Sequence, residues 1–283
     1  MNVKKIALLA NTEKPDVKSV FNEMKDYFSQ MGITVYPVEL ESSTEDFKIK
    51  PIDADLAISV GGDGTVLSCA RIFKETEVPL FAVNMGTFGY MTQISINEYK
   101  DVFKDYLEGK CFCVERMRLN VSVTRNNKTV FSSSALNEFT VSSASRAKMV
   151  KLSLCINGVL AANLRGDGII IATPTGSTAY NLSAGGPILD ANLTAIIINP
   201  ICPFTMGVRP LVISSDSKTE IAIPKQDTSI ILSCDGHEVF NLEEDDVVTV
   251  EKSEHGTLFV ENKRSNFIEV LRNKLGWAGG FNA

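Results

Sequence analysis

The pattern of apolar residues changes near residue 110, and this change restricts the possible folds more than any other feature of the sequence. Before it, short apolar runs such as residues 56–60 alternate with segments of helical periodicity such as residues 17–31. After it, apolar and polar residues alternate strictly, as at residues 119–124, which is typical of half-buried strands. We therefore predict an α/β domain with a parallel, Rossmann-like sheet over residues 1–110, and a mainly antiparallel β domain over residues 111–283.

The individual elements follow from the same periodicities and from turn residues. In the first domain we expect strands at residues 5–10, 33–38, 56–60 and 80–83, and helices at residues 16–31, at 65–73, and from a capping box at 95–98 to about 107. In the second domain we expect hairpin turns at residues 126–127 and 157–158 and a short helix near 177–182. Its strands are expected at residues 119–124, 139–142, 151–156, 168–172, 195–199, 218–224, 230–234, 247–250 and 258–260. We also expect the last residues of the chain to pack back on the first domain.

Charge and cysteine content narrow the possible functions. The 283 residues carry a net charge of −6, so we expect no binding to nucleic acid or to a membrane surface, both of which favour basic proteins. The sequence has no apolar stretch long enough to span a bilayer, and its apolar run at residues 6–10 is shorter than the core of a signal peptide. Six cysteines without a C-x-x-C spacing favour reduced thiols, so we expect a cytoplasmic protein.

A glycine turn, Gly61-Gly62-Asp63-Gly64-Thr65, joins a predicted buried strand to a predicted helix. Ligands of parallel α/β sheets bind at this end of the strands. The glycines let the backbone approach a ligand closely, and the helix start offers N–H groups to a phosphate. The motif is neither a Walker A loop nor the ordinary dinucleotide fingerprint. A plain strand–helix turn is the alternative, but a carboxylate beside a phosphate is unfavourable unless it orients a hydroxyl nucleophile or holds a metal.

Three further segments are candidates for ligand contacts. Residues 173–187 combine hydroxyl side chains with glycines, either to wrap closely around a ligand or to form an ordinary polar loop. Asn137 and Glu138 interrupt a β-prone run, where they could read an adenine edge and a ribose diol, or could lie on a solvated strand face. Residues 165–168 (RGDG) fit a ligand contact or a salt-bridged turn.

Taken together, these segments resemble the NAD kinase family, in its bacterial type that depends on ATP or polyphosphate. The resemblance rests on motifs in the family's order and spacing: GGDGT at residues 61–65, VNMGTFGY at 83–90, NE at 137–138, RGDG at 165–168, TPTGSTAYNLSAGGPI at 173–188 and RPLVI at 209–213. Diacylglycerol kinases, sphingosine kinases and phosphofructokinases carry similar glycine-Asp-glycine motifs. The TPTGSTAY segment is far more specific to NAD kinases.

The resemblance implies phosphorylation of the 2′-hydroxyl of the adenosine ribose of NAD to give NADP. It implies that Asp63 is the general base or hydroxyl-orienting carboxylate. It assigns the phosphate-binding turn to Gly61, Gly62, Gly64 and Thr65. It implies that Asn137 reads adenine, that Glu138 binds the ribose hydroxyls and that Asp167 faces the nicotinamide end. The full set implied to contact NAD is Asp63, Gly64, Asn137, Glu138, Lys148, Arg165, Asp167, Thr175, Thr178, Ala179, Tyr180, Asn181, Leu182 and Ser183, with His237 as a further candidate.

The resemblance also implies an α/β domain followed by a β-sandwich-like domain, as well as partners and a metal. ATP, or alternatively polyphosphate, is the expected phosphoryl donor, and a homodimer or homotetramer is the expected assembly. Mg²⁺, or another divalent cation, is expected to arrive with ATP, and we expect no dedicated protein metal site.

The chain departs from the family pattern at three places. They are Ser68, where many members have a basic residue, Lys148, where a bidentate arginine contact cannot be assumed, and residues 234–237, which read CDGH.

Two other functions stay open from the sequence. A lipid or other small-molecule kinase could share the GGDGT turn, and it would accept an apolar chain and show no selectivity for NAD. A non-catalytic NAD sensor could use the same binding residues, and it would bind NAD without forming NADP.

Overall fold

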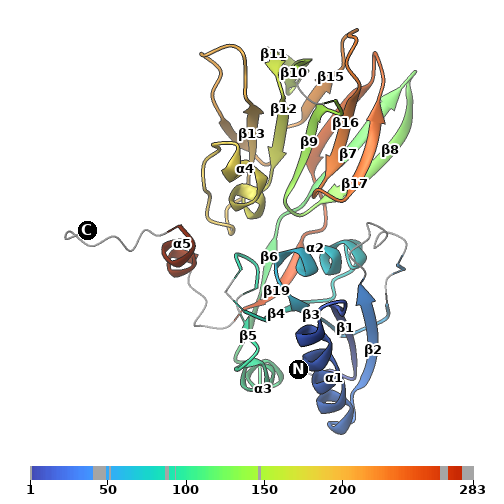
Figure 1. The fold of residues 1–283 in the computed structure, drawn as a ribbon, viewed down its shortest axis with the longest axis vertical. Coiled ribbons are helices and arrows are strands. Elements are labelled where there is room, and N and C mark those ends of the chain that lie inside the picture. Colours follow the sequence, from blue (N-terminus) through green and yellow to red (C-terminus); the bar gives the residue numbers. More distant parts are fainter. Residues whose placement is uncertain are drawn as a thin grey trace, which may run out of the picture. The chain divides into compact units, whose positions relative to one another are not determined.

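The computed structural model describes residues 2–40, 49–50, 52–86, 89–92, 94–145, 148–261 and 267–275. The chain divides into two compact units, each shown in Figure 1. The first unit comprises Met1–Glu115 together with Thr257–Ala283, and the second comprises Arg116–Gly256. Both ends of the chain therefore contribute to the first unit, and the second unit is a continuous insertion.

The first unit is an α/β structure built on one sheet, with strand order β2-β1-β3-β4-β19-β6 and β5 paired to β4 (Figure 1). Its strands are β1 (Lys5–Asn11), β2 (Thr34–Leu40), β3 (Leu56–Gly61), β4 (Leu80–Asn84), β5 (Ile94–Ser95), β6 (Phe112–Arg116) and β19 (Thr257–Glu261). The pairings of β1 with β2 and β3, and of β4 with β3, β5 and β19, are parallel. The predicted α/β class is confirmed.

Helices cover both faces of this sheet, which explains why its central strands are continuous apolar runs. The unit contains the helices α1 (Pro15–Gln30), α2 (Asp63–Ile72), α3 (Tyr99–Leu107) and α5 (Phe267–Leu275). Of these, α1, α2 and α3 contact strands of the sheet. On one face, Leu8 shares a core with Phe28 of α1 and Phe103 of α3, whose rings lie 4.9 Å apart. Successive residues of a strand point to opposite faces, so the buried Leu9 points to the face opposite Leu8. The helix α2 packs against β3 and β1.

The predicted strand at residues 258–260 lies in a different sheet from the one we expect. It forms β19, which pairs with β4 of the first unit and places Phe259 opposite Leu80. Phe259 and Val260 are both buried, as in the other strands of this sheet. The periodicity of a short run identifies a strand but not its partner, because the partner lies far away in the sequence.

The second unit is a β-sandwich of two antiparallel sheets. Within the described residues the strand orders are β11-β10-β15-β18-β7-β8 and β14-β13-β12-β9-β16-β17. The strands are β7 (Leu119–Arg125), β8 (Lys128–Ala135), β9 (Glu138–Ser143), β10 (Val150–Ile156), β11 (Val159–Gly166), β12 (Gly168–Ala172), β13 (Ala195–Ile201), β14 (Leu211–Ser214), β15 (Thr219–Ala222), β16 (Ile230–Cys234), β17 (Glu238–Leu242) and β18 (Val247–Lys252). Alternate residues of both sheets, such as Val121 and Ile171, share one core. The predicted antiparallel sandwich is confirmed.

Short turns and helices connect these strands as the sequence predicts. The turn residues Asn126, Asn127, Asn157 and Gly158 have left-handed φ angles of 50°, 60°, 51° and 77°. Such angles are characteristic of tight two-residue hairpins. The predicted short helix consists of a 3₁₀ turn, η2 (Thr175–Thr178), followed by α4 (Tyr180–Ser183). Across the described part of the chain, no helix combines the length and apolarity needed to cross a membrane.

Candidate active site

The glycine turn of the first unit lies between the carboxyl end of β3 and the start of α2. Gly61 ends the strand, Gly62 is the N-cap residue and Asp63 begins the helix. Gly61 has a φ of 153°, and a Cβ atom there would overlap Thr65 Oγ1, so this position requires glycine. Gly62 and Gly64 are exposed, and a Cβ atom on either would meet no other atom within 4 Å. The turn therefore presents open backbone at a helix start, which suits an anion such as phosphate.

Asp63 is half-buried, and its carboxylate is held by the backbone of a neighbouring segment. Asp63 Oδ2 accepts a hydrogen bond from Tyr90 N at 2.9 Å. Asp63 Oδ1 accepts bonds from Met91 N at 3.1 Å and from Thr92 N and Thr92 Oγ1 at 3.3 and 3.4 Å. A carboxylate oxygen can accept about two hydrogen bonds. Asp63 Oδ2 therefore has capacity to accept one more, for example from a hydroxyl group.

The second unit contains buried polar atoms that lack partners, around the start of β9. Asn137 is 5% exposed and Glu138 is 7% exposed. In the described part of the chain, Asn137 Oδ1, Glu138 Oε2 and Thr175 Oγ1 have no hydrogen-bond partner. A Cβ atom at Gly176 would overlap the carbonyl group of Asn137, so the two segments are in close contact. Buried polar atoms almost always have a hydrogen-bond partner. Three neighbouring buried atoms that lack one therefore indicate a ligand site.

Burial also changes the acidity of this site. Burial first, and the charge of Asp235 second, raise the pKa of Glu138 to about 8. At neutral pH the Glu138 carboxyl group therefore holds a proton and can both donate and accept a hydrogen bond. That capacity matches a ribose diol, whose hydroxyl groups also do both.

The other predicted contacts of residues 173–188 follow Thr175 in the chain. Ala179 and Leu182 are half-buried, and Tyr180 and Ser183 are exposed, so all four can be reached from solvent. Thr178 is half-buried, and its hydroxyl donates to the carbonyl oxygen of its neighbour Thr175 at 3.3 Å.

Asn181 differs from these neighbours because it is fully buried. Its side-chain nitrogen donates to Ser177 O and Pro187 O, each at 3.0 Å. Its side-chain oxygen accepts from Asn199 Nδ2 at 3.1 Å. In the structure Asn181 therefore holds the loop together, and its contact with NAD stays a prediction.

The predicted residues Lys148, Arg165 and Asp167 are all exposed. The Arg165 guanidinium lies 5.3 Å from the centre of the Phe204 ring. Arg165 also lines a cavity of about 400 Å³, together with Met149, Lys151, Lys225, Gln226, Asp227 and Thr228. The sequence analysis does not single out Lys151 and Lys225, because two lysines 74 positions apart give no local motif. Asn137 and Glu138 do not line this cavity.

His237, the remaining candidate, lies in the turn between β16 and β17. It is half-buried, and its backbone N–H donates to Cys234 O at 3.0 Å. For the residues that the structure describes, no group of three or more His, Cys, Asp or Glu side chains is placed to hold a metal ion.

The structure thus groups the predicted residues within each unit. The first unit holds the glycine turn with Asp63, and the second holds Asn137 and Glu138 beside the segment that begins at Thr175. These are features of an enzyme that binds nucleotides: open backbone at a helix start, a carboxylate that can accept a hydrogen bond from a hydroxyl group, and a buried amide beside a protonated acid. The class that fold and site define is a nucleotide-binding phosphotransferase with an α/β unit and a β-sandwich unit.

Comparison with known proteins makes this class specific. Residues 10–111 match the model of the ATP-NAD kinase N-terminal domain, and residues 136–262 match that of the ATP-NAD kinase C-terminal domain. The chain belongs to the NAD kinase family.

Individual relatives agree over nearly the whole chain. The chain is 37% identical to an NAD kinase of Treponema denticola over 278 residues, covering 98% of each chain. Among solved structures, it resembles yeast NADH kinase complexed with NADH, with a TM-score of 0.87, 25% identity, and coverage of 100% of this chain and 90% of the other. It also resembles an NAD kinase from Archaeoglobus fulgidus in complex with ATP, with a TM-score of 0.71, 30% identity, and coverage of 96% and 97%.

Proposed function

We propose that this protein is an ATP-dependent NAD kinase that transfers the γ-phosphoryl group of ATP to the 2′-hydroxyl of the adenosine ribose of NAD. The proposal rests chiefly on the buried pair Asn137 and Glu138, in a chain of the NAD kinase family. Within the described residues, Asn137 Oδ1 and Glu138 Oε2 have no hydrogen-bond partner. The ligands bound to the two solved relatives, NADH in one and ATP in the other, support the same substrates.

In this proposal the second unit recognises the adenosine of NAD. Asn137 binds the adenine edge, since a side-chain amide offers one acceptor and two donors. Glu138 binds the ribose hydroxyls with a carboxyl group that both donates and accepts at neutral pH. Thr175 Oγ1 supplies a third buried polar atom. The remaining walls of the NAD site are Thr178, Ala179, Tyr180, Asn181, Leu182 and Ser183, with Lys148, Arg165, Asp167 and His237 as outer contacts.

Asp63 is proposed to orient the 2′-hydroxyl and to receive its proton. The backbone N–H groups of Tyr90, Met91 and Thr92 hold the carboxylate in one orientation. Asp63 Oδ2 accepts only one of these bonds and keeps capacity for the hydroxyl proton. Phosphoryl transfer has a loose transition state, so the proton leaves late, and positioning of the hydroxyl matters more than the strength of the base.

The donor is proposed to be the complex of ATP with Mg²⁺ or another divalent cation. The metal is then held mainly by phosphate oxygens and water, and it neutralises phosphate charge. The turn of Gly61, Gly62, Gly64 and Thr65 is proposed to bind phosphate oxygens through backbone N–H groups at the start of α2. Thr65 N itself donates to Gly62 O at 3.0 Å and so shapes the turn. Local backbone geometry thereby binds an anion although the protein carries a net charge of −6.

We further propose that the protein is cytoplasmic and forms a homodimer or homotetramer. All six cysteines are free thiols in the structure, as suits a reducing compartment. The edge strand β14 exposes Leu211 and Val212, which are 46% and 45% accessible and could be covered by a second copy. Light scattering on the purified protein tests the assembly.

One assay tests the proposed activity. The purified protein is incubated with NAD, ATP and Mg²⁺, and NADP is measured with an NADP-specific dehydrogenase. Formation of NADP is expected. Binding of NAD without NADP formation would indicate a sensor, and phosphorylation of a lipid or another small alcohol in place of NAD would indicate the other kinase class. Replacing ATP by polyphosphate, and NAD by NADH, defines the range of donors and acceptors.

A further inference from the structure

Asp235 is a buried acid in the turn between β16 and β17, and the proposed chemistry gives it no part. It is 8% exposed. Asp235 and Gly236 have left-handed φ angles of 48° and 70°, and His237 N donates to Cys234 O at 3.0 Å. Asp235 and Gly236 are thus the two central residues of a β-turn, with left-handed angles that an Asp-Gly sequence favours. The turn fixes the backbone of Asp235, and so the point from which its side chain extends.

The Asp235 carboxylate binds the backbone N–H groups of three successive residues. Asp235 Oδ2 accepts from Leu136 N at 2.8 Å, and Asp235 Oδ1 accepts from Asn137 N and Glu138 N at 2.8 and 3.0 Å. In return, Asp235 N donates to Glu138 O at 3.0 Å. Hydrogen bonds from N–H groups to a carboxylate are about twice as strong as neutral ones. One side chain therefore fixes the segment that carries the proposed adenosine-binding residues.

Thr173 binds the other side of the same segment. Thr173 N donates to Asn137 O at 2.9 Å, and Thr173 Oγ1 donates to Leu136 O at 2.6 Å. The backbone polar groups of Leu136 and Asn137 are thus engaged by Thr173 and Asp235. By contrast, Asn137 Oδ1 and Glu138 Oε2 have no partner in the described part of the chain. The backbone of this segment is therefore hydrogen-bonded on both sides, whereas the side chains of Asn137 and Glu138 keep atoms that can bind a ligand.

We infer that Asp235 is a positioning residue for NAD phosphorylation, because its carboxylate fixes the backbone of Leu136, Asn137 and Glu138 and thereby the direction of the two side chains that bind adenosine. The inference rests on the proposed function. Asp235 itself need not touch the substrate.

Asp235 also acts on Glu138 through its charge. Burial makes the larger contribution to the raised pKa of Glu138, and the negative charge of Asp235 adds to it. Removing that charge therefore lowers the pH at which Glu138 loses its proton. A residue that merely stabilised the fold would not change this property of the site.

The main test is the variant Asp235→Asn. Its side-chain oxygen can still accept two of the three N–H groups, but its NH₂ group faces the third and cannot accept from it. We expect the KM and Kd for NAD to rise about tenfold or more, from the loss of a hydrogen bond to a charged group, with a smaller change in kcat. We also expect the pH at which NAD affinity changes to move below its value in the unmodified protein.

A second variant, Asp235→Glu, separates position from charge. It keeps the negative charge but moves the carboxylate by one methylene, so the three N–H groups lose their fitted acceptor. We expect the KM for NAD to rise while the pH dependence of NAD binding stays closer to that of the unmodified protein. This variant also provides the test if Asp235→Asn does not fold.

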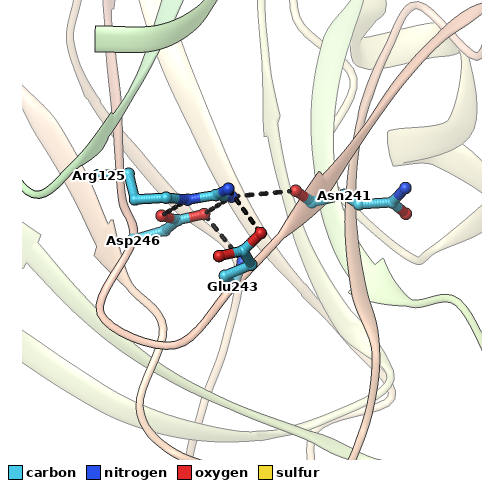
Figure 2. A network of polar contacts seen from close by, with 4 residues as sticks. All are labelled: Arg125, Asn241, Glu243 and Asp246. Atoms are coloured by element: carbon cyan, nitrogen blue, oxygen red, sulfur yellow. Dashed lines mark hydrogen bonds and ion pairs between the residues drawn. The ribbon is translucent and has the colours of Figure 1, made fainter. Parts of the chain in front are cut away.

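Asp246→Asn is the matched control. Asp246 is a fully buried acid of the same unit, and it accepts the backbone N–H of Glu243 at 2.9 Å and bonds from Arg125 (Figure 2). Its network holds a loop that carries none of the proposed NAD contacts. We expect this variant to lower the thermal midpoint but to leave the KM for NAD and its pH dependence unchanged.

The outcomes separate the inference from the proposed function. If the unmodified protein forms no NADP, the proposed function fails. If it forms NADP, and a folded Asp235 variant keeps the same KM and pH dependence for NAD, the inference is wrong. The inference is also wrong if Asp235→Asn and Asp246→Asn change both quantities equally, because Asp235 would then act only through stability.

Discussion

Gly89 lies so close to Asp63 that a Cβ atom at position 89 would overlap the Asp63 carboxylate. Gly89 also donates its N–H to Thr92 Oγ1 at 3.0 Å, within the segment that holds that carboxylate. We therefore expect Gly89→Ala to displace Asp63 and to lower kcat for NADP formation by about tenfold or more, as expected when a catalytic group is misplaced by a fraction of an ångström. Steady-state kinetics, with NAD affinity measured by calorimetry, check this.

Gly207→Ala is the control for that variant. Gly207 lies in the loop before β14, and a Cβ atom there would meet no other atom within 4 Å. Its kcat should equal that of the unmodified protein. An unchanged kcat in Gly89→Ala would show that the orientation of Asp63 is unimportant.

Asp63→Asn tests the proposed base directly. Its amide cannot take up the hydroxyl proton, so we expect kcat to fall by about 10²- to 10⁴-fold, the usual contribution of a positioned general base. The Kd for NAD should change little, because Asn still presents a side-chain oxygen and most of the proposed contacts with NAD are made by other residues. Turnover close to that of the unmodified protein would contradict the assignment of Asp63.

Gly176→Ala tests the close contact between the two segments of the adenosine site. A Cβ atom at this position would overlap the backbone of Asn137, which cannot give way as the end of a side chain can. We expect weaker NAD binding, by about tenfold or more, and a lower thermal midpoint, since overpacking typically costs ~1–3 kcal/mol. Calorimetric titration with NAD and a thermal melt measure the two effects, and Gly207→Ala again serves as control.

The raised pKa of Glu138 predicts a pH-dependent stability. The folded protein holds this proton up to a pH of about 8, whereas an unfolded glutamate, with an ordinary pKa of 4.5, loses it near pH 4.5. Between these values the folded state binds more protons than the unfolded state, so this contribution is complete below the lower pKa and is lost as the pH rises through the upper one.

Urea unfolding measures this contribution. From pH 5 to pH 8, the free energy of unfolding should fall more steeply in the unmodified protein than in Glu138→Gln, which has no proton to lose. Glu254→Gln, at an exposed position, should behave like the unmodified protein. Parallel pH profiles for all three proteins would mean that Glu138 ionises normally.

The network around the buried Asp246, shown in Figure 2, predicts that removing Arg125 lowers the stability of the protein but not its activity. Arg125 Nε and Nη2 each lie 2.8 Å from a carboxylate oxygen of Asp246, which is fully buried. Burial raises the pKa of Asp246, but the bonds from Arg125 and Glu243 outweigh burial, so the pKa is lowered. Arg125→Ala leaves this charge without its partner, and we expect a loss of ~3–5 kcal/mol in the free energy of unfolding.

Lys218→Ala provides a comparison on the surface. Lys218 pairs with Glu220 at 2.8 Å, with both side chains partly exposed, and such pairs contribute ~0–1 kcal/mol. Chemical denaturation measures both variants, and neither should alter the KM for NAD. A similar small loss in both would show that the Arg125 network is no stronger than a surface pair.

Features that depend on nearby residues could be predicted from the sequence. The apolar spacing that predicts a helix over residues 16–31 buries Val17, Phe21, Met24 and Phe28 of α1 against the sheet. The glycine turn lies at the end of a strand and the start of a helix, as its own residues require.

Contacts between distant residues could not be predicted. Asp235 binds residues 97 to 99 positions away, and its Asp-Gly sequence indicates only the turn, not the segment that its carboxylate reaches. Asn181 also shows that distant contacts cannot be predicted from a local motif. Its motif resembles a ligand-binding segment, but its side chain is engaged by Ser177, Pro187 and Asn199.

The place of β19 in the first sheet has a consequence for synthesis of the chain. β19 (Thr257–Glu261) pairs with β4 (Leu80–Asn84), and the whole second unit lies between them in the sequence. A ribosome therefore completes the sandwich before it releases the strand that the first unit still needs. Domains generally fold as units during synthesis. The sandwich, although second in the sequence, can be the first unit to fold completely. The unit that carries Asp63 can complete its sheet only after residues 257–261 have been synthesised.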